Sequence, residues 1–182
     1  MKRTPVFLRD PTAEIAASRR APVAAPSDLT GRTIALLDIG KMRGDEFVDR
    51  LDALLRARGF ATRRWKKPTN TRTAPIEILQ DIAANSAAVI IALSDCGSCT
   101  SCSTHDLNDL DLRGVPGVNI LTEEFRDAAA RQEEALGFEG RTVFVPHPIL
   151  NRTTAEIHAI AERHLDGILG MLGAEPARGS AA

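Results

Sequence analysis

The sequence has no run of apolar residues that approaches the roughly 18 positions that a membrane-spanning helix needs. The first residues, Met1-Lys2-Arg3, are basic, but no apolar core follows them, so we expect no secretory signal. Positive charge is not in excess, because 23 Lys and Arg residues stand against 24 Asp and Glu residues, for a formal net charge of -1. Domains that bind nucleic acid normally carry a clear basic excess. These absences predict a cytoplasmic protein that contacts neither membrane nor nucleic acid.

Motifs of several common enzyme classes are also missing. No Gly-x-Gly-x-x-Gly follows the first predicted strand, so a Rossmann dinucleotide site is disfavoured. The Walker phosphate loop and the Gly-x-Ser-x-Gly elbow of hydrolases are absent as well. The three cysteines are an odd number and all fall between positions 96 and 102, which excludes a scaffold held together by disulfides.

The sequence does contain a regular alternation of apolar segments over residues 32–172, which we interpret as one domain. An extended arm rich in Ala, Pro and Arg precedes it at 1–31, and a flexible tail follows it at 173–182. Short apolar runs predict strands at 32–38, 60–65, 87–93, 117–121 and 141–145. Apolar residues at helical spacing predict helices at 45–58, 74–84, 100–113, 123–136 and 153–172.

Five strands that alternate with five helices predict an α/β fold, a single doubly wound three-layer sandwich around a mainly parallel sheet. The favoured strand order is the flavodoxin-like 2-1-3-4-5. In such folds ligands bind beyond the C-terminal ends of the strands, here beside the first and third. The candidate site is therefore made by Asp38 and Lys41 after the first strand, residues 95–102 after the third, and His147 after the fifth.

The cysteine-containing segment 95–102 runs from the most apolar predicted strand into a predicted helix. Cys96 lies at the helix start, where unpaired N–H groups and the helix dipole favour an anion and lower the pKa of a thiol. Gly97 allows a sharp turn and the close approach of a ligand. Cys99 lies three residues further on, at the spacing of a resolving thiol. Cys102 falls one helical turn later and is interpreted as a buried core cysteine.

A different interpretation of the same cysteines stays open. Cys96, Cys99 and Cys102 could ligate zinc or an iron–sulfur cluster, with His105 or His147 as a fourth ligand. Against this, the second and third cysteines lie on a predicted regular helix, and the sequence has no distant fourth cysteine. We therefore favour thiol chemistry without a cofactor and keep metal or cluster binding as the alternative.

The segment Cys96-Gly97-Ser98-Cys99 resembles the motif of the UGSC-like family, named for Sec-Gly-Ser-Cys. This resemblance covers nearly the whole chain and includes residues 36–41. More distantly, the C-terminal half resembles the selenoprotein B subunit of glycine, sarcosine and betaine reductase. The stretches that carry this second resemblance are 95–105, 114–118 and 145–148.

The resemblance implies a reactive sulfur at position 96. In the reductase subunit a selenocysteine attacks the α-carbon of the substrate, and a partner protein processes the carboxymethyl selenide. Carried onto this chain, the nucleophile is Cys96 and the second redox position is Cys99. This chain departs from the reductase subunit in three ways. Sulfur replaces selenium, which makes reductive C–N cleavage harder. The chain is also much shorter than the subunit, and it contains no pyruvoyl-forming partner. The resemblance therefore supports a thiol-active site more than any particular substrate.

Other residues near the predicted strand ends are candidates for binding substrate. Lys41 is placed to favour the Cys96 thiolate or to hold a carboxylate or phosphate, although a solvated loop lysine fits the sequence equally well. Gly97 and Ser98 lie beside the thiol and complete this set with Asp38. For Asp38 an acid/base role and a capping role both stay open.

His147 is the candidate general acid or base. It stands between Pro146 and Pro148, which fix the backbone around it, and a rigidly held histidine suits proton transfer. The match to the Pro-His-Pro segment of the reductase subunit adds to this expectation. Asp95, by contrast, is interpreted as a structural cap.

The leading hypothesis is a thiol-dependent oxidoreductase that acts on a small, anionic substrate. Cys96 attacks, Cys99 resolves, and His147 and Lys41 assist proton transfer or anchor the substrate. The cycle ends in a Cys96–Cys99 disulfide that a thiol reductant such as a thioredoxin-type protein reduces. The alternatives are a metal- or cluster-binding module and a non-catalytic subunit that needs a partner subunit for chemistry.

Overall fold

A computed structural model describes residues 19–173, so that residues 1–18 of the predicted arm and 174–182 of the predicted tail lie outside the described residues. The strands are β1 (Thr33–Asp38), β2 (Ala61–Lys66), β3 (Ala88–Ser94), β4 (Gly117–Thr122) and β5 (Thr142–Val145). The helices are α1 (Gly44–Ala57), α2 (Ile76–Asn85), α3 (Gly97–Leu112), the short 3-10 helix η1 (Glu123–Phe125), α4 (Arg126–Leu136) and α5 (Thr154–Met171). Within this described part, no helix is long and apolar enough to span a bilayer.

The strands form one parallel sheet in the order β2-β1-β3-β4-β5, which confirms the predicted doubly wound fold and its 2-1-3-4-5 order. The most apolar run becomes the central strand β3, which is buried along its whole length. At the end of β1, Asp38 pairs with Lys66 of β2 and with Ala92 of β3. The C-terminal ends of adjacent strands therefore meet at one edge of the sheet, as the predicted site requires.

The helix boundaries follow the sequence closely, with one difference at α3. Prediction placed its start at Thr100, whereas the helix begins at Gly97, directly after an extended Cys96 with φ -164° and ψ 161°. The first turn, Gly97-Ser98-Cys99, carries no apolar spacing that periodicity could detect. The sequence pattern Thr153-x-x-Glu156 predicts a capping box at the start of α5, and the structure has it, because the side chains of Thr153 and Glu156 bind each other's backbone N–H groups.

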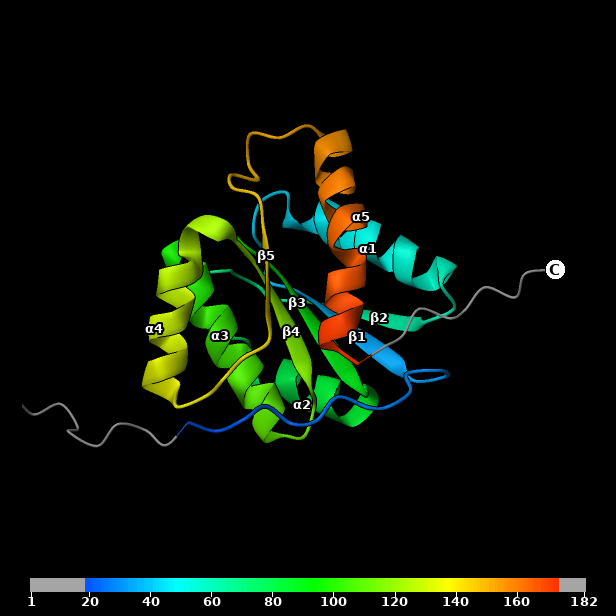
Figure 1. Ribbon diagram of the computed structural model, residues 1–182, viewed down its shortest axis with the longest axis vertical. Coiled ribbons are helices and arrows are strands. Elements are labelled where there is room, and N and C mark those ends of the chain that lie inside the picture. Colours follow the sequence, from blue (N-terminus) through cyan, green and yellow to red (C-terminus); the bar gives the residue numbers. More distant parts are fainter. Residues whose placement is uncertain (1–18, 174–182) are drawn as a thin grey trace, which may run out of the picture.

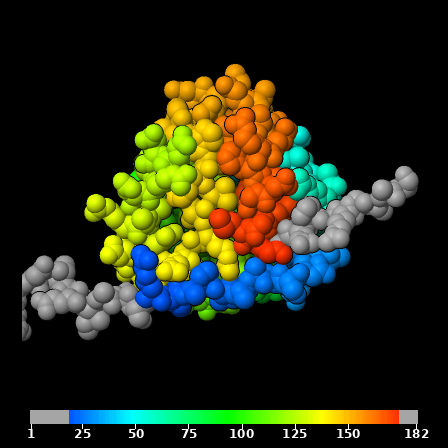
Figure 2. Space-filling view, in the orientation of Figure 1, coloured from blue at the N-terminus to red at the C-terminus, as the bar shows by residue number. Residues whose placement is uncertain are grey.

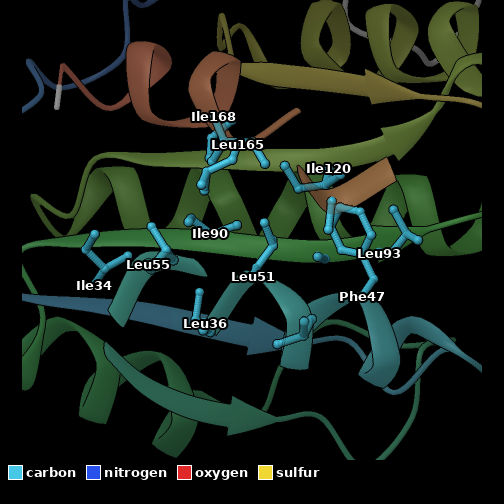
Figure 3. Packing of buried hydrophobic residues seen from close by; sticks show 14 of the residues in the cluster. Ile34, Leu36, Phe47, Leu51, Leu55, Ile90, Leu93, Ile120, Leu165 and Ile168 are labelled. Atoms are coloured by element: carbon cyan, nitrogen blue, oxygen red, sulfur yellow. The ribbon is translucent and has the colours of Figure 1, made fainter. Parts of the chain in front are cut away.

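Helices cover both faces of the sheet: α1 and α5 pack on one face, and α2, α3 and α4 lie on the other (Figure 1). Figure 3 shows how side chains from α1 and α5 interlock with those of the strands. The labelled residues are Ile34, Leu36, Phe47, Leu51, Leu55, Ile90, Leu93, Ile120, Leu165 and Ile168. Burial of each such side chain stabilises the fold by about 1.5–3 kcal/mol. This core fixes the strand ends that present the site.

Residues 19–31 cross the N-terminal edge of the sheet, along the bottom of the view in Figure 2, where they are blue. Arg20 forms a backbone bridge to Phe138, and its guanidinium pairs with the buried carboxylate of Asp111. The same carboxylate accepts a hydrogen bond from the Val23 N–H at 2.8 Å. This part of the predicted arm is therefore packed on the domain, at the edge opposite the cysteines.

Candidate functional site

A disulfide joins Cys96 and Cys99 at the beginning of α3, where their Cα atoms are 5.3 Å apart. The carbonyl oxygen of Cys96 accepts hydrogen bonds from the N–H of Thr100 at 3.0 Å and from its hydroxyl at 2.9 Å. Cys96 is partly exposed, whereas Cys99 is completely buried. An external thiol or substrate can therefore reach the sulfur of Cys96 but not that of Cys99.

The helix start supplies positive electrostatic potential around the exposed sulfur. Cys96 is the N-cap residue of the 16-residue α3, as the sequence predicted. The N–H groups of the first helical turn precede the first intrahelical hydrogen bond, and no acidic side chain occupies that turn. Both features favour a thiolate at Cys96 once the disulfide is reduced. The exposed Gly97 and Ser98 leave this position open, and the Ser98 hydroxyl lies 3.6 Å from the Cys96 sulfur.

A hydrogen-bonded pair of side chains, Asp95 and His147, lies immediately before Cys96. The Nδ1 atom of His147 is 2.7 Å from Oδ1 of Asp95, and the hydroxyl of Thr122 is 3.0 Å from both atoms. The other carboxylate oxygen of Asp95 accepts the N–H of Ile149 at 3.3 Å. The Asp95 side chain is only 6% exposed and that of His147 29%. This arrangement makes Nδ1 of His147 the hydrogen-bond donor to Asp95, while Nε2 has no hydrogen-bond partner among residues 19–173.

The Asp95–His147 pair was not predicted, although His147 itself was singled out. The sequence predicted a structural capping role for Asp95. The structure shows that Asp95 accepts the N–H of Ile149, as a cap does, and that it also contacts the imidazole of His147. The sequence assigned no role to Thr122, which directly follows the predicted strand 117–121. The signal that could have joined them is their position, because all three lie at or just after the C-terminal ends of the neighbouring strands β3, β4 and β5.

Asp38 is the last residue of β1 and Lys41 follows it in the loop, next to the end of β3. The Ile39 N–H donates to the Ala92 carbonyl at 2.9 Å, which keeps the two strand ends together. Lys41 is half-buried, and no carboxylate of residues 19–173 lies within 4.0 Å of its ammonium group. Its predicted contact with an anionic substrate stays a prediction.

Asp38 is completely buried, and both of its carboxylate oxygens have partners. One oxygen accepts the Gly40 N–H at 2.8 Å, and the other accepts a hydrogen bond from Arg64 at 2.8 Å and lies 3.5 Å from the Lys66 ammonium. These contacts orient the loop that carries Lys41. The role of Asp38 in binding substrate stays a prediction.

A second set of contacts ties the loop after β1 to the loop after β5. Arg43 donates two hydrogen bonds to Glu46, at 2.7 and 2.9 Å, and a third to the carbonyl oxygen of Arg152. Thr154 donates to the same Glu46 carboxylate at 2.8 Å. The hydrogen bonds from Arg43, followed by that from Thr154, lower the pKa of Glu46 to about 2. The carboxylate therefore stays ionised and holds the loops of Lys41 and His147 in fixed relation.

The connection between β2 and α2, to which the sequence assigned no role, contacts the cysteine pair. Asn70 in this connection donates a hydrogen bond from Nδ2 to the sulfur of Cys99 at 3.1 Å. In the same connection, the buried Lys67 forms an ion pair at 2.6 Å with the buried Asp106, which lies further along α3. Lys67 belongs to a Lys-Lys doublet, a pattern typical of exposed residues, so its burial could not be expected.

Cys102 departs from its predicted position. It is a free thiol that is partly exposed, and it does not lie in the core. At about 100° per residue along a helix, position 102 falls at the margin of the buried face of α3, which Cys99 and Ser103 occupy. In the described part of the chain, no three His, Cys, Asp or Glu side chains gather closely enough to hold a metal ion. Cys96 and Cys99 of the alternative ligand set are instead bonded to each other.

Comparison with protein families identifies one match. The sequence pattern of the UGSC family aligns with residues 7–174, which is most of the chain. No curated protein matches the sequence at a significant level. The predicted distant relation to selenoprotein B of the reductases has no support from these comparisons.

Solved structures align with the chain at low identity. A diflavin flavoprotein A3 from Nostoc sp. aligns with a TM-score of 0.47 and 14% identity, over 78% of this chain and 93% of that one. A flavodoxin-like domain from Synechococcus sp. gives 0.44 and 14%, over 77% and 95%. The sugar isomerase domain of an RpiR transcription factor from Sphaerobacter thermophilus gives 0.42 and 13%, over 78% and 73%. The fold class is established by the strand order itself.

Proposed function

The chain belongs to the UGSC family, and we propose that it is a thiol-dependent oxidoreductase whose nucleophile is Cys96 and whose resolving thiol is Cys99. The observation that carries this proposal is the Cys96–Cys99 disulfide at the N-terminus of α3, with one sulfur exposed and the other buried. A redox pair needs this asymmetry, because the substrate must contact only one sulfur, and the other sulfur must react only with the covalent intermediate that then forms.

The proposed cycle transfers two electrons from the two thiols to the substrate. The Cys96 thiolate attacks an electrophilic atom of the substrate and bonds to it through sulfur, while the bond from that atom to its leaving group breaks and the leaving group takes the electron pair. The Cys99 thiolate then attacks the Cys96 sulfur, which breaks that covalent bond and passes its electron pair to the departing group. The product leaves reduced by two electrons, and the protein is left with the disulfide. A dithiol reductant, such as a thioredoxin-type protein, restores the two thiols.

His147 is the group proposed to supply the proton to the departing product. Its Nδ1 is engaged by Asp95 and Thr122, so Nε2 is the nitrogen that exchanges a proton with the substrate. The Asp95 carboxylate stabilises the imidazolium that exists before the proton is given up. Lys41, with the exposed turn at Gly97, suits a small anionic substrate.

The test of the proposal uses glutathione disulfide as the oxidant. The fully reduced protein is mixed with it, the reaction is quenched with acid, and the disulfides are mapped by mass spectrometry of peptides. We expect the Cys96–Cys99 disulfide to form before Cys102 reacts. Equal reaction of all three cysteines would contradict the proposal. Zinc or iron bound in stoichiometric amount by the purified protein, and lost in Cys102→Ser, would favour the metal-binding alternative instead.

Replacing His147 with alanine is expected to slow product release from the Cys96 intermediate by about 100-fold, the ordinary contribution of a positioned general acid. Alkylation of Cys96 by iodoacetamide, which needs no proton from the protein, should continue at a similar rate. Asp95→Asn should give a smaller loss in the same step, because the amide oxygen still accepts the Nδ1–H but carries no charge. Single-turnover oxidation by glutathione disulfide measures the rate, with His164→Ala on α5 as the matched control. An unchanged rate in His147→Ala would remove this residue from the mechanism.

A further inference from the structure

The buried sulfur of Cys99 has a polar partner outside α3. The side-chain amide of Asn70 donates a hydrogen bond to it at 3.1 Å. Asn70 lies in the connection between β2 and α2, and nothing in the proposed cycle so far uses it. We propose that Asn70 is a catalytic residue that stabilises the Cys99 thiolate whenever the Cys96–Cys99 bond breaks or forms. This inference rests on the proposed function and adds a group that acts on the resolving sulfur.

The need for such a donor follows from where the charge develops. When an external thiolate attacks Cys96, the electron pair of the Cys96–Cys99 bond moves onto the Cys99 sulfur. That sulfur is completely buried, so water cannot solvate the charge, and burial disfavours a thiolate. A neutral amide N–H directed at the sulfur stabilises the anion without itself gaining or losing a proton.

The amide is held in place by the two ends of its own loop. The ammonium group of Lys67 contacts one oxygen of Asp106 at 2.6 Å, and the N–H of Ala74 donates to the other oxygen at 2.7 Å. Both residues of the ion pair are fully buried. Asp106 therefore attaches the connection to α3 at one residue before Asn70 and at one residue after it. Because Cys99 and Asp106 are two helical turns apart, they lie on the same face of the helix.

A close approach of the backbone adds to this fixation. Gly40 in the loop after β1 has φ +78°, and a Cβ atom there would meet the Lys67 carbonyl oxygen at 3.0 Å. The connection that carries Asn70 is therefore packed against the β1 loop as well as against α3. The Asn70 donor is preorganised, so little rearrangement is needed as charge moves to the sulfur.

Asn70 assists the reduction of the Cys96–Cys99 disulfide. The thiolate of a dithiol reductant bonds to the Cys96 sulfur, the Cys96–Cys99 bond breaks, and Cys99 leaves as a thiolate that accepts the Asn70 hydrogen bond. The second thiol of the reductant, as its thiolate, attacks the mixed disulfide and releases Cys96 as a thiolate. The reductant is oxidised by two electrons to its disulfide, and the two protein thiolates then take up protons from water.

The test measures how fast dithiothreitol reduces the oxidised full-length protein, followed by acid quenching and mass spectrometry. We expect Asn70→Ala to lower the second-order rate constant about tenfold, the size of one hydrogen bond to a charged group. Asn70→Asp, which has the same shape but no amide donor, should be slower still because its charge opposes the thiolate. Thr73→Ala, an exposed change in the same connection, serves as the control and should match the wild type.

The outcomes separate the two proposals. Unchanged rates in both Asn70 variants would overturn the role of Asn70 while leaving the redox pair intact. Failure of the wild-type protein to form the Cys96–Cys99 disulfide at all would overturn the proposed function itself. If Asn70→Ala does not fold, the near-isosteric Asn70→Asp still decides, since its rate must fall below that of Thr73→Ala.

Discussion

Replacing Cys96 with serine is expected to abolish the thiol-dependent reaction without unfolding the protein. Cys96 is partly exposed at the end of the sheet, and the hydrogen bonds of its backbone to α3 run through its carbonyl oxygen, which the substitution leaves in place. A hydroxyl of similar size is not ionised at neutral pH and cannot form a disulfide. The free energy of unfolding of the reduced protein should therefore change by no more than about 1 kcal/mol.

The matched variant is Cys99→Ser, which keeps the nucleophile and removes the resolving thiol. With glutathione disulfide it should stop at a mixed disulfide between Cys96 and glutathione, while Cys96→Ser should form none. Peptide mapping by mass spectrometry distinguishes these products. If Cys96→Ser instead unfolds the protein, or if Cys99→Ser carries glutathione at Cys102, then Cys96 is a structural cysteine and the mechanism is wrong.

Replacing Asp106 with asparagine is expected to destabilise the protein by about 3–5 kcal/mol, because it leaves the ammonium group of Lys67 buried without its counter-charge. Burial raises the pKa of Asp106, and the charge of Lys67, together with its hydrogen bond, opposes that rise. Asparagine keeps an oxygen for the N–H of Ala74, so the loss measures the ion pair rather than the loop contact. Urea unfolding at neutral pH gives the free energy.

The control for this prediction removes both charges together. In the double variant Lys67→Met and Asp106→Leu, no unpaired charge remains, but the N–H of Ala74 loses its acceptor. We expect the double variant to lose only about 1–3 kcal/mol, less than Asp106→Asn alone. A decrease of less than about 1 kcal/mol in the free energy of unfolding of Asp106→Asn would contradict this prediction. It would show that the Lys67 ammonium group reaches water and that the ion pair does not hold the loop that carries Asn70.

The parts of the fold that rest on local patterns could be read from the sequence. The all-apolar run predicted the position of β3, and the pattern Thr153-x-x-Glu156 predicted the start of α5. The placement of Cys96 at a helix start followed from its position between a buried strand and a predicted helix. The strand order was a choice among known arrangements, and the structure confirms it.

Two of the features that escaped prediction depend on residues that are distant in the sequence. The Asp95–His147 contact joins the ends of β3 and β5, and no local signal links those positions. Lys67 belongs to a Lys-Lys doublet of the kind that is usually exposed, yet its side chain is buried in an ion pair with Asp106 of α3. Cys102 was expected in the core because cysteine is usually buried, but the phase of α3 leaves it partly exposed.

The central claim, that Cys96 is an activated nucleophile, is tested most directly by alkylation. The protein is reduced, treated with chelator and labelled with iodoacetamide over a range of pH, and the labelled peptides are mapped by mass spectrometry. Because Cys96 is exposed at the N-terminus of α3 and Cys99 is buried, we predict that Cys96 alone reacts at a pH well below the roughly 8.5 of a free thiol. Equal titration of Cys96 and Cys102, or no reaction at Cys96, would contradict the account.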